Sequence, residues 1–175
     1  MNQVSEVFHE IFTTKTFSYF RQIGYGFALM ESPETKRIDF PMHEYRTLIR
    51  ERHLDSFGHV NNAQYLVLFE EARWEMITSR GYGLQAVKQH EVGTVVLECT
   101  VRFKRELGLR EEVVIRTQVQ EISKKTLVLK HWIVKEGEVI AAEATFHLGC
   151  FDLKHRKLIP LSADWLRAIS GRLPL

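Results

Sequence analysis

A carboxylate and a helix start lie close together in residues 55–65, and this pairing suits acyl transfer to water. The first N–H groups of a helix have no partner within the helix and carry the positive end of its dipole. They suit an anion or a carbonyl oxygen that gains negative charge, so the start of this helix offers an oxyanion site. Asp55 lies seven residues before Asn62 on a turn with Gly58, so its carboxylate can face the same substrate as a base or a nucleophile.

Ordinary structural roles compete with catalysis for these residues. Asp and Asn before a helix are common capping and turn residues. By itself, His59 is more typical of a turn histidine that binds a backbone carbonyl than of a catalyst. The case for catalysis therefore depends on the elements that hold these side chains.

A long helix is predicted to begin at this turn. The side-chain oxygen of Asn61 can cap it by accepting an orphan backbone N–H, while Gln64 reaches back as in a capping box. Apolar residues at helical spacing continue as far as Ile77, and Gly81 predicts the end. The first half of this helix is apolar nearly all round, so other elements must cover it.

Five strands with alternating apolar and polar residues surround this helix in the sequence. One precedes it at residues 43–52, and four follow with short links, which favours antiparallel neighbours. Their apolar positions are Val95, Leu97, Cys99, Val101 and Phe103; Val113, Ile115, Thr117 and Val119; Leu127, Leu129, His131 and Ile133; and Ile140, Ala142, Ala144, Phe146, Leu148 and Cys150. A short helix is predicted at residues 162–169. This order predicts an α+β fold in which an antiparallel sheet wraps around one long central helix.

The composition is that of a globular domain. The 175 residues are 45% hydrophobic and 26% charged, and a formal net charge of +2 gives no indication of a nucleic-acid partner. Cys99 and Cys150 form no CxxC pair, and no metal or cofactor is expected. Without a secretory signal or an apolar run long enough to span a membrane, the expected location is the cytoplasm.

Two segments are predicted along the chain. Residues 1–40 form an aromatic-rich extension with a short amphipathic helix near residues 4–12, which most often packs on its own domain or on a neighbouring subunit. Turn-forming residues at 32–34 mark its end. Residues 41–175 form the domain that carries the motif.

The motif Asp-x-x-Gly-His-Val-Asn-Asn-x-x-Tyr resembles that of hotdog-fold acyl-CoA thioesterases of the 4-hydroxybenzoyl-CoA thioesterase type. The resemblance covers about residues 41–155 and implies hydrolysis of an acyl thioester without a metal or bound cofactor. It implies that Asp55 is the general base or nucleophile and that Asn62 donates its backbone N–H to the thioester oxygen. The other motif residues, Gly58, Asn61 and Tyr65, are then expected to contact the substrate.

A second resemblance is to plant acyl-carrier-protein thioesterases, which share the His-Val-Asn-Asn segment and place a catalytic acid in an Arg-Glu-x-Gly stretch. Residues 105–108 match that stretch, so this resemblance implies a site of Asp55, His59 and Glu106. Phe57 stands where those enzymes carry a catalytic Asn, and this departure weakens a mechanism centred on His59.

Other residues are candidates for weaker roles. A further thioesterase branch uses a helix carboxylate about eight residues past its oxyanion donor, which would be Glu70. Arg102 and Lys104 would bind the phosphates of coenzyme A or an acidic carrier protein, unless they form a solvated strand edge. Candidates for acyl-chain specificity are Phe69, Arg73 and Trp74.

Three rival functions remain open. A hotdog dehydratase would carry a His-centred Pro-Gly-rich signature, which is lacking here. A non-catalytic module that binds or senses acyl-CoA would not need Asp55, and an interaction domain would recruit its partner through the aromatic N-terminus. Because one such sheet leaves an edge to cover, and known relatives pair their sheets, a homodimer or a homotetramer is expected.

Overall fold

The computed structural model describes residues 40–172. The predicted extension and its amphipathic helix lie outside these residues, except for Phe40. Phe40 is buried, and its carbonyl oxygen accepts a hydrogen bond from Gln118 Nε2 at 2.8 Å. The described chain is therefore anchored to the sheet from its first residue.

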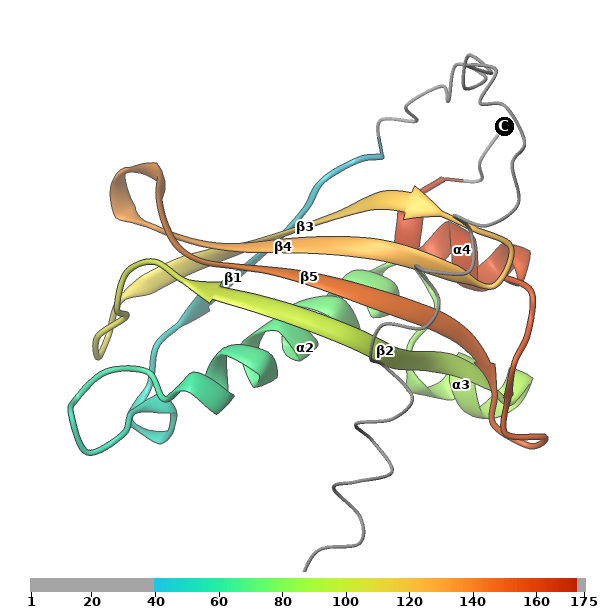
Figure 1. Cartoon of the computed structure of the whole chain (residues 1–175), viewed down its shortest axis with the longest axis horizontal. Coiled ribbons are helices and arrows are strands. Elements are labelled where there is room, and N and C mark those ends of the chain that lie inside the picture. Colours follow the sequence, from blue (N-terminus) through green and yellow to red (C-terminus); the bar gives the residue numbers. More distant parts are fainter. Residues whose placement is uncertain (1–39, 173–175) are drawn as a thin grey trace, which may run out of the picture. The chain divides into compact units, whose positions relative to one another are not determined.

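One antiparallel sheet with the strand order β1-β3-β4-β5-β2 forms the main layer, and the short β6 pairs with β5 (Figure 1). The strands are β1 (His43–Leu48), β2 (Val92–Phe103), β3 (Glu112–Ile122), β4 (Thr126–Lys135), β5 (Val139–Asp152) and β6 (Lys157–Leu158). The five predicted strands are confirmed. Distant segments meet at the left-hand end of Figure 1, where the turn before α2 lies beside the segment after β2.

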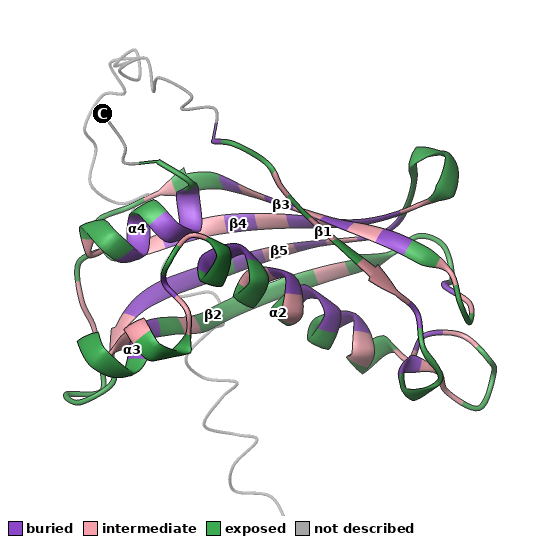
Figure 2. Ribbon diagram, turned by 180° about the vertical axis from the view of Figure 1, so that it is seen from behind, coloured by how far each residue is buried: buried purple, intermediate pink, exposed green. Residues whose placement is uncertain are grey.

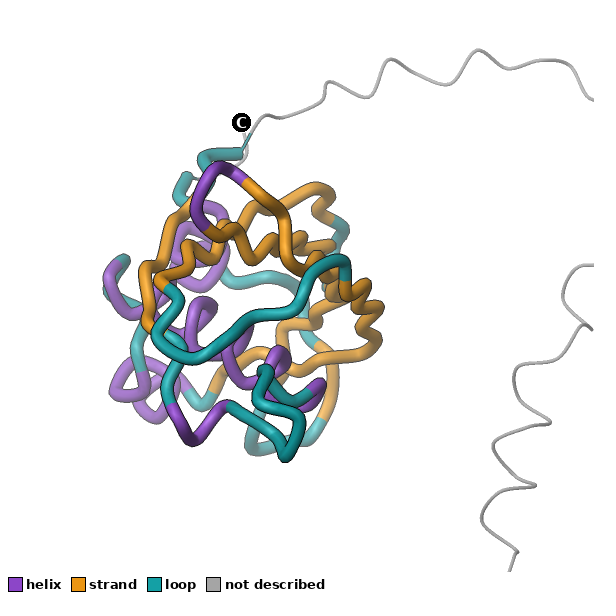
Figure 3. Tube along the Cα trace, turned by 90° about the vertical axis from the view of Figure 1, so that its left-hand side faces the viewer, coloured by secondary structure: helices purple, strands orange, loops and turns teal. Residues whose placement is uncertain are grey.

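The predicted long helix is α2 (Asn62–Ser79). In Figure 3, which looks at the left-hand end of Figure 1, the strands curve around the helical layer. Leu66 and Val67 remain 40% exposed, so the helix is covered less completely than its sequence predicts. Its buried residues are Tyr65, Leu68, Phe69, Ala72, Met76 and Ile77.

The predicted C-terminal helix is α4 (Ala163–Ser170), which packs at the C-terminal end of α2. Its residue Trp165 is fully buried, and the indole N–H donates to Thr94 Oγ1 at 2.9 Å. Between α2 and β2 lies α3 (Leu84–His90), which the sequence did not predict. Its seven residues bury only Val87, which is too little to give a helical pattern.

The first strand is shorter than the predicted 43–52. It ends at Leu48, although Ile49 still pairs with the segment before β3 by accepting from Arg110 N and donating to Glu111 O, both at 2.9 Å. The chain then turns into the 3₁₀ helix η2 (Glu51–His53). This turn replaces the predicted end of the strand and leads the chain towards Asp55.

The predicted apolar face of β2 is wrong, because the face changes side within the strand. The register with β5 shifts just after Val96, as in a β-bulge. Val95 opposes Gly149 on the outer face, whereas Cys99 opposes the core residue Phe146 on the inner face. Most of β2 is exposed, in contrast to the buried positions of β3, β4 and β5 (Figure 2).

Candidate active site

The turn that carries Asp55 is held by hydrogen bonds within it. Asp55 N donates to His59 O at 2.9 Å, and Gly58 N donates to Asp55 O at 3.1 Å. Gly58 has a φ of +86°, a left-handed conformation that favours glycine. The Asp55 Oδ1 atom accepts from Phe57 N at 2.8 Å, so the carboxylate is fixed by the turn it stabilises.

The start of α2 leaves one backbone donor without an acceptor. Asn61 is the N-cap, as predicted, but its Oδ1 accepts from Ala63 N at 2.9 Å rather than from Gln64 N. Gln64 N instead donates to Asn61 O at 2.9 Å. Within residues 40–172, no acceptor binds the N–H of Asn62, the first residue of the helix. This N–H is available to a ligand.

The segment after β2 closes the other side of the turn. Val60 N donates to Leu107 O at 2.9 Å, and His59 forms an isolated antiparallel bridge with Gly108. The bridge brings His59 Nε2 to 3.3 Å from Glu106 Oε2. Their side chains are 44% and 75% exposed, so this pair faces solvent. The residues that resemble the plant enzymes are therefore neighbours in space.

A cavity of about 380 Å³ lies between the turn, the start of α2 and the end of β2. Burial raises the pKa of its Tyr65, as do the charges of Glu111 and Glu106, so the phenol stays protonated. The ring of Tyr65 packs edge-on against Phe103, with 4.9 Å between ring centroids. The cavity is lined by Asp55, His59, Val60, Asn62, Tyr65, Phe103, Lys104, Arg105 and Glu106.

Several predicted site residues do not line this cavity, among them the specificity candidates Phe69, Arg73 and Trp74. Gly58 and Asn61 shape the backbone of the turn and cap the helix. Arg102 lies on the outer face of β2, where its 74% exposed side chain pairs with Glu143 at 3.5 Å. Glu70 lines a separate cavity of about 390 Å³, together with other residues of α2 and with Tyr45 of β1. The carboxylate of Asp55, not that of Glu70, shares the cavity with the free N–H.

His53 supports the turn and was not predicted from the sequence. It is 1% exposed, its Nδ1 accepts from Arg50 N at 3.1 Å, and its carbonyl accepts from Asn61 N at 2.9 Å. Burial lowers the pKa of His53, and the charges of Arg52 and Arg50 lower it further against the opposing effect of Glu71. The only sequence feature that pointed to His53 was its position two residues before Asp55, and this position does not reveal that its side chain is buried.

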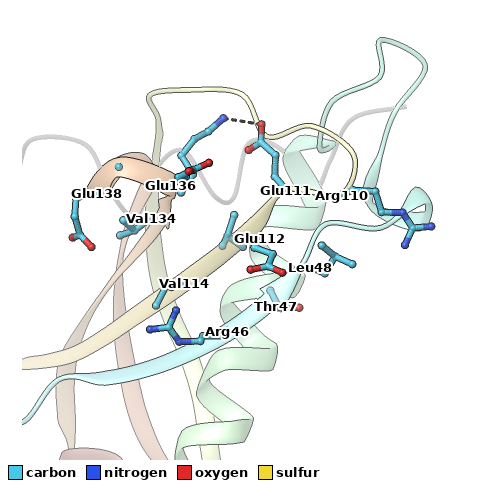
Figure 4. Close-up of a pocket in the computed structure, with 13 residues that line it drawn as sticks. Arg46, Thr47, Leu48, Arg110, Glu111, Glu112, Val114, Val134, Glu136 and Glu138 are labelled. Carbon is cyan, nitrogen blue, oxygen red and sulfur yellow. Dashed lines mark hydrogen bonds and ion pairs between the residues drawn. The ribbon is translucent and has the colours of Figure 1, made fainter.

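A larger open depression of about 1010 Å³ lies at the ends of β1, β3 and β4 (Figure 4). None of the predicted site residues lines it. Several of its charged groups form ion pairs: Lys135 Nζ lies 2.8 Å from Glu111 Oε1, and Arg110 pairs with Glu51. Since neither Asp55 nor the start of α2 lines it, this depression is a poor candidate for acyl transfer.

The described residues contain neither a cluster of metal ligands nor a membrane-spanning helix. Between Phe40 and Arg172, no three His, Cys, Asp or Glu residues gather closely enough to hold a metal ion. In the same part of the chain, no helix has the length and apolarity to cross a membrane.

Comparison with known proteins identifies the family. Residues 49–169 match the thioesterase-like superfamily. The long-chain acyl-CoA thioesterase FadM of Escherichia coli is 32% identical over 117 residues, which are 66% of this chain and 88% of FadM. The acyl-CoA thioester hydrolase YbgC of E. coli is 29% identical over 98 residues, 56% of this chain and 73% of YbgC.

A solved structure agrees with this assignment. The crystal structure of the probable thioesterase YbaW from E. coli aligns with a TM-score of 0.65 at 28% identity. The alignment covers 75% of this chain and 98% of YbaW. The antiparallel sheet curved around α2 is thus the hotdog fold, as predicted. The chain belongs to the thioesterase-like superfamily and is a thioester hydrolase.

Proposed function

We propose that the protein hydrolyses acyl-CoA, with Asp55 and the start of α2 as the catalytic apparatus. The observation that carries this proposal is the cavity shared by the Asp55 carboxylate and the unpartnered N–H of Asn62. The thioester oxygen accepts from this N–H and gains charge as the carbonyl carbon is attacked. FadM and YbgC, whose names specify acyl-CoA, support the choice of substrate.

Asp55 can act in either of two mechanisms of hydrolysis. As a general base, Asp55 takes a proton from water, the oxygen attacks the carbonyl carbon, the C–S bond breaks, and the proton passes to the departing thiolate. As a nucleophile, Asp55 attacks directly, the thiolate leaves, and water then hydrolyses the mixed anhydride. In both versions the backbone donor stabilises the same oxyanion.

His59 and Glu106 form a second acid–base pair beside Asp55, as in the arrangement that the plant enzymes imply. Their 3.3 Å separation lets Glu106 orient the imidazole, which can protonate the leaving thiolate. A Glu106→Gln variant separates this role from that of Asp55. If His59 acts as the acid through Glu106, the variant loses kcat although Asp55 is intact.

Lys104 and Arg105 line the cavity and are the proposed contacts for the phosphates of coenzyme A. Lys104 also pairs with Glu143 at 3.0 Å, the carboxylate that Arg102 contacts, so its ammonium is shared with a second partner. A phosphopantetheine on an acidic carrier protein offers the same thioester, and competition assays with acyl carrier protein distinguish the two substrates. A cytoplasmic location remains a prediction.

We also propose a homodimer, or a homotetramer built from dimers, formed through β2. This strand is twelve residues long, pairs only with β5 among the described strands, and leaves Val96, Leu97 and Phe103 about half exposed. Such an edge favours pairing with a second copy. Light scattering with Leu97→Lys tests this: the variant should shift to monomer.

Thiol release from a panel of short, long and aromatic acyl-CoAs tests the catalytic proposal. Asp55→Asn should lower turnover at least about a hundredfold while the protein remains folded. Asp164→Asn, on the exposed side of α4, is the matched control and should keep full activity. Equal turnover of Asp55→Asn and wild type would refute the role of Asp55. Acyl-CoA binding without turnover in the wild type would support a non-catalytic sensing module.

A further inference from the structure

Arg73 carries a largely buried guanidinium without a carboxylate partner. Its Nη1 atom is inaccessible to solvent and has no hydrogen-bond partner, and no described carboxylate lies within ion-pair distance. Its Cζ lies 4.3 Å from the centre of the Phe146 ring. Burial lowers the pKa of Arg73 while Glu70 and Cys99 act in the opposite direction, and an arginine remains charged under all such conditions.

A buried guanidinium without an acceptor lowers the stability of the folded protein. Partly buried cations elsewhere in the described residues have partners: Arg80 Nη1 donates to Ala168 O at 2.9 Å, and Lys135 contacts Glu111 at 2.8 Å. A buried charge that lacks a partner usually destabilises a protein by several kcal/mol. No described residue therefore accepts a hydrogen bond from Nη1 of Arg73, which leaves this donor open to a ligand.

The position of Arg73 connects it to the candidate active site. Eleven residues separate it from Asn62, which is close to three helical turns, so both residues lie on the same side of α2. Leu66, 40% exposed, lies between them on that side. On the inner face of β2, Phe103 lines the candidate cavity, and Cys99 lies opposite Phe146, whose ring the guanidinium covers. Leu66 on α2 and the inner face of β2 thus lie between the cavity and the guanidinium.

We infer that Arg73 binds a carboxylate at the far end of the acyl chain, so that the preferred substrates are CoA monothioesters of dicarboxylic acids. This inference rests on the proposed function. A guanidinium matches a carboxylate in a two-pronged hydrogen bond. A terminal methyl group would leave the desolvated cation uncompensated, which disfavours an ordinary fatty acyl chain.

The geometry sets the chain length. Eleven residues at about 1.5 Å each place Arg73 roughly 16 Å from Asn62 along the helix axis. Because long side chains in a helix lean towards its N-terminus, the guanidinium lies roughly 12–16 Å from the oxyanion donor. An extended chain advances about 1.2 Å per bond, so the carboxylate is about 10–13 bonds from the thioester carbonyl.

Thiol release from the CoA monothioester of dodecanedioic acid, compared with dodecanoyl-CoA, tests this inference. The wild type should prefer the dicarboxylic substrate at least about tenfold in kcat/KM. Arg73→Met keeps the length and apolar stem, and it should lose this preference while still hydrolysing dodecanoyl-CoA. Arg73→Lys should show a smaller preference, and Arg46→Met, 77% exposed on β1, should behave as wild type.

Calorimetric binding of the two free acids gives a readout that does not require hydrolysis. Dodecanedioic acid should bind the wild type at least about tenfold more tightly than dodecanoic acid, and Arg73→Met should abolish the difference. Equal affinities, or a preference that survives in Arg73→Met, would overturn the inference. So would dissociation of the oligomer by Arg73→Met with substrate preference unchanged, which would show that a second copy supplies the acceptor. Failure of the wild type to hydrolyse any acyl-CoA would refute the proposed function instead, and the binding comparison would still decide the role of Arg73.

Discussion

The two ends of α2 differ in how completely their polar groups are hydrogen-bonded and in how deeply their neighbours are buried. At the N-terminal end, the N–H of Asn62 has no acceptor, and Phe57 in the adjoining turn is 81% exposed. At the C-terminal end, Arg80 Nη1 donates to two carbonyls of α4, and Tyr82 is 3% exposed. One helix therefore offers an unsatisfied donor to a ligand at one end and uses hydrogen bonds for stability at the other. Substitutions at the first end should change activity, and those at the second should change stability.

The largest effect is expected from Asn62→Pro, which removes the proposed oxyanion donor. Proline is well tolerated at the first helical position, and Asn61 already has the extended conformation, φ −60° and ψ 142°, that a following proline requires. We expect kcat for acyl-CoA hydrolysis to fall by about 10²–10³ with little change in the free energy of unfolding.

Asn62→Ala is the matched control, because it removes the side chain and keeps the backbone N–H. It should retain nearly full kcat. A folded Asn62→Pro enzyme with wild-type turnover would show that the helix start does not act on the oxyanion.

At the other end, Arg80→Met removes the charged donor to Ala168 O and Ile169 O. Urea unfolding should show a loss of about 1.5–3 kcal/mol, with kcat/KM unchanged at a temperature where the variant is folded. Arg167→Met, with a 58% exposed side chain on α4, should be nearly neutral. A fall in kcat/KM without a loss of stability would contradict the division between the two ends.

The middle of α2 covers a buried polar pair that makes stability depend on pH. Thr117 Oγ1 lies 2.8 Å from His131 Nδ1, and burial, aided by the charge of Arg73, holds the pKa of His131 well below its usual value. The unfolded chain takes up a proton near pH 6.5 whereas the folded chain does not. Stability therefore falls as the pH drops below about 6.5, by up to about 1.4 kcal/mol per pH unit.

Urea unfolding between pH 7.5 and 5 measures this slope. The double variant His131→Leu with Thr117→Val should flatten it without stranding the Thr117 hydroxyl. Part of the slope should remain, since His53 is also buried with a lowered pKa. An unchanged slope in the double variant would exclude His131 as its source.

The smallest effect should come from Phe57→Ala at the open end. Because the ring is 81% exposed, the free energy of unfolding should change by less than about 0.5 kcal/mol. Tyr82→Phe is its counterpart at the closed end, where loss of the 3.2 Å hydrogen bond to Val92 O should cost about 1 kcal/mol. If thermal unfolding ranked the two in the reverse order, the open end would be the better packed one.

Much of the fold followed from periodicity. The N-cap of α2 at Asn61 and the end of the helix near Gly81 were predicted because capping residues and a long apolar pattern agree there. The change of face in β2 after Val96 was not predicted, because a bulge depends on pairing with β5 and leaves no local signal in the sequence. α3 was missed because a seven-residue helix contains too few repeats.

The candidate site was predicted in part, because some of its residues are close together in the sequence. Asp55 and Asn62 lie within one motif, so local turn chemistry places them together. Glu106 lies more than forty residues later, and only the resemblance to a family linked it to His59. The burial of His53 and of Arg73 depends on tertiary packing, which no spacing rule reveals.

The pairing of β1 with β3 also has a consequence for synthesis on the ribosome. His43 opposes Thr117, so the first strand has no partner until some seventy more residues have emerged. During this interval the apolar face of α2 is also uncovered, whereas β3, β4 and β5 can pair as soon as their short turns are made. We therefore expect the turn with Asp55 and the segment with Glu106 to join late, so that a truncated nascent chain would be prone to aggregate before it could acquire a site.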